Sequence, residues 1–145
     1  MNENRLEPYF RLVAVWSKSG IGTSIVVESH VGTRIALDIG STRIFHETVS
    51  AKIVLVTHGH LDHIAGIFSH ARAHYLSSDR RSIATYYVPS ALAGKLEEAR
   101  TAMSNLDSAN RDGRVALPDD VIMMNIVGVN PGDEIPIPNA ETNER

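Results

Sequence analysis

Three histidines and an aspartate fall within six consecutive residues near the middle of the chain. They are His58, His60, Asp62 and His63, in the run THGHLDH. Imidazole nitrogens and carboxylate oxygens suit Zn²⁺ first, and also Mn²⁺ or Fe²⁺. The chain contains no cysteine, so any metal ion would have to be held by His, Asp or Glu. We therefore interpret this run as a metal-ligand loop.

Two adjacent metal sites fit this spacing better than one site does. Six consecutive residues rarely wrap four ligands tetrahedrally around a single ion. Gly59 allows the backbone to bend between the first two imidazoles, because glycine has no Cβ to restrict it. Two cations about 3.5–4 Å apart can share a water molecule and activate it for a displacement reaction. The pattern therefore favours a metal-dependent hydrolase over a solvated surface loop.

The elements that would position this loop can be predicted from hydrophobic periodicity. The apolar run 52–56 predicts a strand buried on both faces, which ends where the loop begins. Upstream, strands are expected at 10–16, 23–29 and 33–38, the last two joined as an antiparallel hairpin with Gly32 in its turn. The stretch 41–51 is either a short helix or a loop.

A helix, a strand and a longer helix are expected after the loop. The first helix begins at Ile64, although Gly66 weakens it, and a short strand covers 85–88. Apolar residues then recur with helical spacing from Leu92 to Leu106, which predicts an amphipathic helix packed on the core. A buried strand is expected at 121–129, and a short edge-like strand limited by two prolines at 134–138.

Four further histidines are interpreted as structural. His70 and His74 are four residues apart, a spacing that can bind a metal, but no carboxylate lies beside them in the sequence. We therefore expect them on an exposed helix face. His30 and His46 are expected at the surface or in loops.

Composition predicts one globular domain and restricts the classes of partner that it could bind. The chain has 145 residues, of which 43% are hydrophobic and 21% charged. Its net charge of −3 gives no general attraction for nucleic acid, which would need a local patch. No apolar run is long enough to span a membrane and the first residues do not resemble a secretory signal, so we expect a cytoplasmic or nuclear location. Residues 1–8 are interpreted as a flexible arm, 9–138 as the domain and 139–145 as a polar tail.

Two longer stretches of sequence carry a family resemblance. The segment KIVLVTHGHLDHIAGIF, preceded by ALDIG, resembles the metallo-β-lactamase superfamily, whose signature is His-x-His-x-Asp-His after a buried strand. The runs YYVPSALAGKLEEARTAMSNLD and NIVGVNPGDEIPIP are similar to ribonuclease Z, the endonuclease that removes tRNA 3′ trailers. The second pair of runs is much less specific than the first. Together they cover roughly residues 15–138.

This resemblance implies a zinc-dependent endoribonuclease. His58 and His60 would bind one zinc ion, and Asp62 and His63 the other. Asp62 would also orient the attacking water or accept its proton, and Asp38 would support the ligand loop. The implied reaction is attack of water on the phosphodiester after the discriminator base of a precursor tRNA, which leaves a 3′-hydroxyl.

The sequence departs from the family pattern in its second half. The family completes its two sites with a further His, a bridging Asp and a final His, but no histidine follows His74 here. Each metal would then have two protein ligands where about three are wanted. We therefore interpret the chain as the N-terminal half of an α/β (α+β) domain of the αββα sandwich type, with a mixed sheet and two helices on its outer face. It would be a fragment, a truncated gene model or a degenerate paralogue, and could be active or inactive in this form.

An uncovered apolar sheet face is a further consequence of half a sandwich. It would pair with the missing half or with a second copy of the chain. Two other functions stay open: a hydrolase of the same fold that acts on a thioester, lactone or cyclic phosphodiester, and a non-catalytic remnant that keeps the motif.

Overall fold

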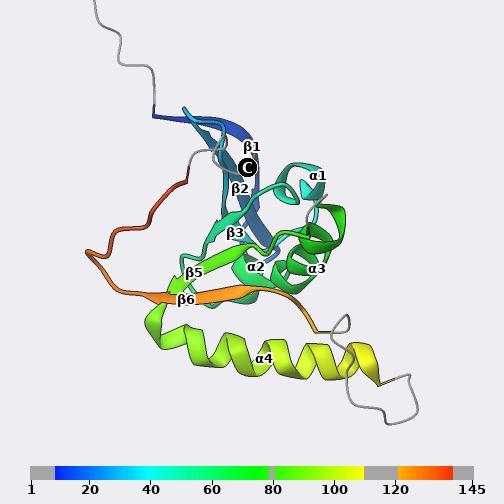
Figure 1. Cartoon of the computed structure of the whole chain (residues 1–145). Helices are drawn as coiled ribbons and strands as arrows, with labels where there is room; N and C mark the ends of the chain where they lie inside the picture. The colour runs from blue at the N-terminus through cyan, green and yellow to red at the C-terminus, as the bar shows by residue number, and fades with distance from the viewer. Residues whose placement is uncertain (1–8, 79–80, 110–120, 139–145) are drawn as a thin grey trace, which may run out of the picture.

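A twisted six-stranded sheet runs through the part of the chain that the structure describes (Figure 1). The computed structural model describes residues 9–78, 81–109 and 121–138. The strands are β1 Phe10–Lys18, β2 Gly22–Ser29, β3 Arg34–Ile39, β4 Ile53–Leu55, β5 Thr85–Pro89 and β6 Asn125–Val129. They lie in the sheet in the same order as in the chain.

The sheet changes from antiparallel to parallel at β3. The pairs β1–β2 and β2–β3 are antiparallel, whereas β3–β4, β4–β5 and β5–β6 are parallel. Gly32 has a φ of 82° in the β2–β3 turn, where its amide donates to the Ser29 carbonyl at 2.9 Å. This confirms the predicted hairpin, because a positive φ is a conformation that glycine adopts without strain. The parallel pairs require crossovers, which the helices provide.

Two short and two longer helices connect the strands in the described ranges. The helices are α1 Phe45–Thr48, α2 Leu61–Ile64, α3 Ile67–Ser77 and α4 Ser90–Ser108. The predicted single helix from Ile64 is therefore two helices with a break at Gly66. The Gly66 amide donates to the Ile39 carbonyl at 2.8 Å, and a Cβ at Gly66 would lie 2.9 Å from that oxygen. The end of β3 thus packs into the break, where no side chain fits.

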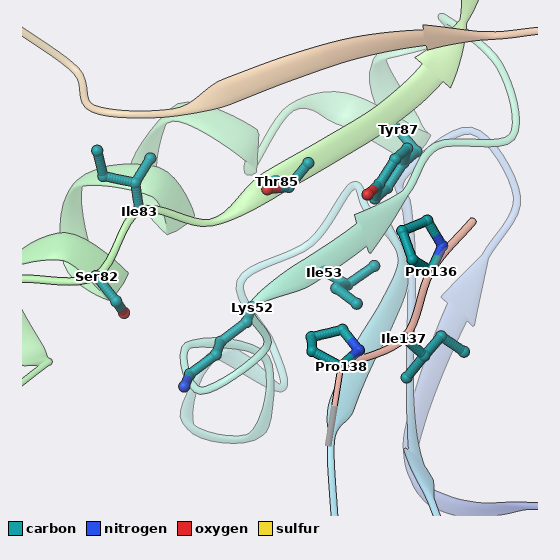
Figure 2. A pocket seen from close by; sticks show the side chains of 9 residues that line it. All are labelled: Lys52, Ile53, Ser82, Ile83, Thr85, Tyr87, Pro136, Ile137 and Pro138. Carbon is teal, nitrogen blue, oxygen red and sulfur yellow. The ribbon is translucent and has the colours of Figure 1, made fainter. Parts of the chain in front are cut away.

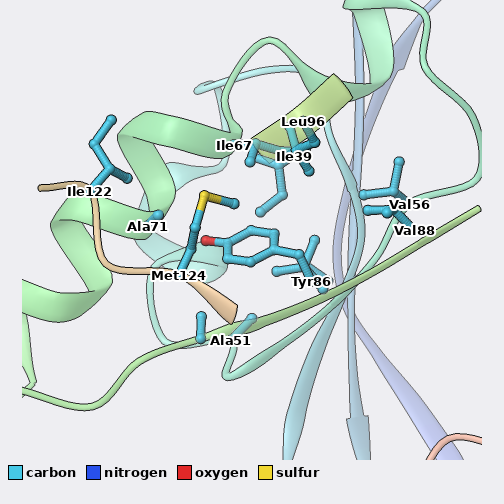
Figure 3. Close-up of a cluster of buried hydrophobic side chains, with 13 residues drawn as sticks. Ile39, Ala51, Val56, Ile67, Ala71, Tyr86, Val88, Leu96, Ile122 and Met124 are labelled. Atoms are coloured by element: carbon cyan, nitrogen blue, oxygen red, sulfur yellow. The ribbon is translucent and has the colours of Figure 1, made fainter. Parts of the chain in front are cut away.

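The hydrophobic core lies between the sheet and the two longer helices (Figure 3). Val26, Ala36, Val54 and Tyr86 are register partners across β2 to β5, and all are fully buried. Ala36, Val54 and Tyr86 form one cluster with side chains from α3 and α4, among which Ile67, Ala71 and Leu96 are buried. Burial of each large apolar side chain contributes about 1.5–3 kcal/mol, so this face holds the sheet and helices together.

The opposite face of the sheet is crossed by the residues after β6. Pro136, Ile137 and Pro138 lie beside Ile53 and border a cavity of about 450 Å³ (Figure 2). Thr33 Oγ1 donates to the Pro138 carbonyl at 2.6 Å. The strand expected at 134–138 is wrong, because these residues form no strand pairing. Pro136 and Pro138 have no N–H group to donate to a neighbouring strand.

Two other predicted elements differ from the structure. The strand expected at 121–129 begins only at Asn125, although Ile122 and Met124 before it are buried. The amphipathic helix is confirmed as α4, but only part of its apolar stripe reaches the core. Leu96 is buried, whereas Met103 is 41% and Leu106 67% exposed. The helix therefore extends beyond the sheet that it covers.

The mixed sheet with helices agrees with the predicted α/β (α+β) class. Figure 1 shows α4 running along β5 and β6, while α1, α2 and α3 gather near β2 to β4. The expected arm at 1–8 and tail at 139–145 lie outside the described residues. Within the three described ranges, no helix has the length and apolarity to cross a membrane.

Candidate functional site

The candidate site lies just beyond β4 in the centre of the sheet. Strand β4 ends at Leu55, the Val56 amide still donates to the Tyr87 carbonyl at 2.9 Å, and the chain then leaves the sheet. Thr57–His60 form an irregular loop, and α2 begins at Leu61. The ends of central parallel strands are where ligands usually bind in α/β sheets, because the loops there surround a crevice. The histidine run thus occupies the expected position for a functional site.

Asp38 holds this loop from the neighbouring strand. It lies near the end of β3, is 3% exposed and has a φ of 57°, a conformation uncommon outside glycine. The Thr57 amide donates to Asp38 Oδ1, and Thr57 Oγ1 donates to Oδ2, both at 2.7 Å. His63 Nδ1 also lies 2.7 Å from Oδ2. Asp38 therefore fixes both ends of the loop, the supporting role that the family resemblance implied.

The same network determines which ring nitrogens carry protons. A carboxylate only accepts hydrogen bonds, so His63 Nδ1 must donate to Asp38. The Thr57 hydroxyl donates its one hydrogen bond to Asp38. Its oxygen must therefore accept a hydrogen bond from His58 Nδ1, which is 2.9 Å away. In the neutral form of each imidazole, the remaining nitrogen, Nε2, then carries a lone pair. Hydrogen bonds from the nitrogen that does not face the metal orient histidines that bind metals.

The four residues of the motif lie close together. The ring centroids of His58 and His63 are 4.0 Å apart, and those of His58 and His60 are 4.6 Å apart. Asp62 Oδ2 lies 3.7 Å from His63 Nε2, which is too long for a hydrogen bond. The Gly20 amide, in the β1–β2 turn, donates to the same Oδ2 at 3.0 Å. The site therefore receives a backbone contact from a turn that is distant in sequence.

Close backbone packing restricts one position beside the motif to glycine. A Cβ at Gly40 would lie 1.7 Å from the Asp62 carbonyl oxygen. No side chain can occupy that space unless the backbone of α2 moves. Gly40 therefore allows the end of β3 to approach the loop closely enough for the Asp38 contacts.

The donor atoms suit a divalent cation in pairs. Zinc binds imidazole nitrogen at about 2.0–2.1 Å and carboxylate oxygen at about 2.0–2.2 Å. Two such atoms 3.7 Å apart, like His63 Nε2 and Asp62 Oδ2, can therefore contact one ion. Across residues 9–78, 81–109 and 121–138, however, no three His, Asp or Glu side chains are arranged to hold a metal. The residues fit the chemistry of zinc, and His63 with Asp62 forms one pair of ligands rather than a triad.

Comparison of the sequence with known proteins identifies no family for this chain. No protein-family model matches the chain, and neither does any curated protein.

His70 and His74 are buried, so the prediction that they lie on an exposed helix face is wrong. His70 is fully buried between the Tyr86 hydroxyl, at Nδ1, and the Thr48 carbonyl, 2.9 Å from Nε2. Nε2–H must donate to that carbonyl, so Nδ1 accepts from Tyr86. His74 similarly contacts the Val49 carbonyl through Nδ1, at 2.7 Å, and Ser82 Oγ through Nε2, at 2.9 Å.

Burial keeps these two histidines neutral. It lowers the pKa of His70 to about 4, partly opposed by the Thr48 carbonyl. Burial likewise lowers the pKa of His74, partly opposed by the Val49 carbonyl. Both side chains satisfy carbonyls at the end of α1, which have no partner within the helix. His70 and His74 are therefore structural, and the exposed positions of His30 and His46 agree with the sequence prediction.

Proposed function

We propose that this chain is a metal-dependent hydrolase of the metallo-β-lactamase type, with two Zn²⁺ ions bound through His58, His60, Asp62 and His63. The observation that carries the proposal is the Asp38 network. It fixes the orientations of His58 and His63, and their Nδ1 donors are used by oxygens. Such an arrangement leaves Nε2 of each ring as the atom that can bind a ligand.

Each residue has a defined part in the proposed chemistry. His58 and His60 would hold one ion, and Asp62 with His63 the other. When bound, zinc would supply Lewis-acid activation of water for attack on a phosphodiester. The Gly20 amide occupies one carboxylate oxygen of Asp62, so the other oxygen is the one positioned to accept a proton. Asp38 would keep the imidazoles oriented throughout.

The proposed substrate is the 3′ trailer of a precursor tRNA, as in ribonuclease Z. This assignment comes from the sequence resemblance of 86–107 and 125–138. With four motif ligands and no histidine after His74, two ions would have about two protein ligands each, fewer than zinc sites normally have. We propose that further ligands come from another polypeptide segment.

A second candidate is a hydrolase of the same fold that acts on a thioester or lactone. A mostly apolar cavity of about 420 Å³ lies beside the loop, between α2, α3 and α4. Gly59, Leu61 and Ile64 line it on the loop side, and Leu92 and Met103 line it from α4. Cavities of this size and character accommodate apolar groups of small molecules. This feature would suit an acyl substrate better than a phosphodiester.

Zinc titration with two substrate assays tests these proposals. The full chain is titrated with Zn²⁺ by calorimetry, and then incubated with a 3′-extended tRNA and with a thioester. We expect zinc binding that is lost in His58→Ala and Asp62→Ala, whereas the matched surface variants His30→Ala and His46→Ala retain it. Cleavage of the tRNA at the trailer supports the first candidate, and hydrolysis of the thioester alone supports the second. Zinc binding without turnover would indicate a non-catalytic remnant, and absence of zinc binding would refute the metal site.

A further inference from the structure

We propose that Trp16, Lys18 and Arg43 form a binding site for single-stranded RNA beside the histidine loop. The inference deepens the proposed function and rests on it for its biological setting, since it names the surface that would position the substrate. Its physical basis, however, is independent of any metal.

The three side chains come together from two separate segments. Trp16 and Lys18 are two residues apart in β1, so their side chains leave the same face of the strand. Arg43 follows the end of β3, and its guanidinium carbon lies 5.6 Å from the centre of the Trp16 ring. Trp16 is half-buried, whereas Lys18 and Arg43 are exposed. The cluster therefore presents one aromatic ring with two cations at the surface.

This cluster adjoins the candidate site through three glycines. A Cβ at Gly22 would lie 3.0 Å from the Trp16 ring and 2.8 Å from the Gly40 carbonyl oxygen. Gly40 in turn packs against the Asp62 backbone, and Gly20 donates to the Asp62 carboxylate. Gly22 and Gly40 therefore connect Trp16 to Asp62 in the loop that is proposed to perform hydrolysis.

Lys18 and Arg43 differ from most other cationic side chains in the described part of the chain because they have no acidic partner there. Arg11 and Arg34 pair with Glu28, and Arg72 pairs with Asp107. Lys95 and Arg100 pair with Glu98 and Glu97. By contrast, neither Lys18 nor Arg43 forms an ion pair with any carboxylate in those ranges. A chain with a net charge of −3 needs such a local patch to attract a polyanion.

These features together match the chemistry of single-stranded RNA. Its unpaired bases stack on aromatic rings and on guanidinium planes, and its phosphates are neutralised by lysine and arginine. The Asp62 carboxylate opposes binding of a phosphate directly at the loop. Lys18 and Arg43 would therefore hold the strand beside the loop, with a base stacked on the Trp16–Arg43 pair.

Trp16 is the only tryptophan in the chain, so its fluorescence reports on this site alone. The probe is a short single-stranded oligoadenylate, added to the full chain in the presence of a chelator. We expect saturable quenching of the Trp16 emission together with binding measured by fluorescence anisotropy of labelled RNA. Because no metal or cleavage is involved, failure of zinc binding or of tRNA cleavage would leave this result unaffected.

Variants test the contribution of each part. Loss of a base–aromatic stack weakens binding roughly five- to hundredfold, so Trp16→Leu should bind the oligoadenylate at least fivefold more weakly and Trp16→Phe close to normally. Arg43→Gln with Lys18→Gln should also weaken binding. Lys52→Gln is the matched control, because Lys52 is an exposed lysine at the other end of β4. Circular dichroism establishes that each variant is folded.

Three outcomes would overturn the proposal. The first is an absence of quenching in the wild-type chain on addition of RNA. The second is equal weakening by Lys52→Gln and by the Arg43 and Lys18 substitutions, which would indicate non-specific charge attraction. The third is binding of inorganic polyphosphate as tight as that of RNA with no effect of Trp16→Leu, because polyphosphate has no bases to stack.

Discussion

Lowering the pH from 7 to 4 should destabilise the fold through His70. This side chain is fully buried, and both of its ring nitrogens are used by neutral partners, the Tyr86 hydroxyl and the Thr48 carbonyl. A proton added at Nδ1 would remove the acceptor that Tyr86 needs and would place a charge in the core. The neighbouring ring of His74, 5.7 Å away between centroids, would disfavour that charge further.

The magnitude follows from the difference between the folded and unfolded pKa values. Burial lowers the pKa of His70 from 6.5 to about 4 in the folded state. Between these values the unfolded chain binds a proton that the folded chain does not, so the free energy of unfolding falls as the pH falls. Each pKa unit corresponds to about 1.4 kcal/mol, and the full effect is therefore about 3 kcal/mol. It is absent above pH 6.5 and complete below pH 4.

Urea denaturation at several pH values measures this effect. The wild type is compared with His70→Gln, whose amide can donate to Thr48 and accept from Tyr86 without titrating. The control is His46→Gln, since His46 is exposed on α1. We expect His70→Gln to lose less stability between pH 6.5 and 4 than the wild type does, by about 3 kcal/mol. Burial also lowers the pKa of His74. His74 therefore adds the same pH dependence of stability to all three proteins.

Equal slopes for the wild type and His70→Gln would refute this reasoning. They would mean that water or a structural change accommodates the protonated ring at little cost. A smaller slope in His46→Gln would also contradict it, because the acid sensitivity would then originate at the surface. Far-ultraviolet circular dichroism at pH 7 establishes that the variants have the same secondary structure before acidification.

Two further predictions concern the loop itself. Gly40→Ala should lower the free energy of unfolding by about 3 kcal/mol, because the new Cβ would lie 1.7 Å from the Asp62 carbonyl oxygen. The control is Gly94→Ala in α4, where a Cβ would have nothing within 4 Å. This control should raise the free energy of unfolding by up to about 1 kcal/mol. Equal unfolding midpoints for the two would contradict the packing argument. Asp38→Asn keeps a residue that tolerates positive φ but removes an acceptor from His63 or Thr57, so it should weaken zinc binding by roughly 10–100-fold, as calorimetry would measure. Unchanged affinity would show that Asp38 does not orient the ligands.

The strands and the ligand loop could be predicted because their signals are local. Apolar and β-branched runs indicated β1 to β5 within a few residues, and the histidine spacing indicated a loop at the end of β4. The register of parallel strands then brings Asp38 beside Thr57, although they are 19 residues apart. This contact was expected only from the family resemblance, because periodicity does not specify which strands are neighbours.

The contacts that could not be predicted depend on tertiary structure. His70 and His74 occupy helical positions that also suit an exposed face. Only the position of α1 against α3 shows that their rings donate hydrogen bonds to carbonyls at the end of α1. The Gly20 contact with Asp62 joins residues 42 apart, with no sequence signal in the turn. The two prolines at 136 and 138 were interpreted as limits on a short strand, and this was wrong because residues 134–138 form no strand.

The Asp38 network has a consequence for the order in which the site forms. Asp38 is held at a positive φ and makes three contacts with the loop. Backbone strain of this kind costs about 1–3 kcal/mol and persists only where surrounding contacts offset it. These contacts are made entirely by protein atoms, so the loop is ordered before any ion binds. A zinc ion at the proposed site would then meet a loop backbone and His58 and His63 imidazoles that are already oriented, which favours fast binding with little change in secondary structure.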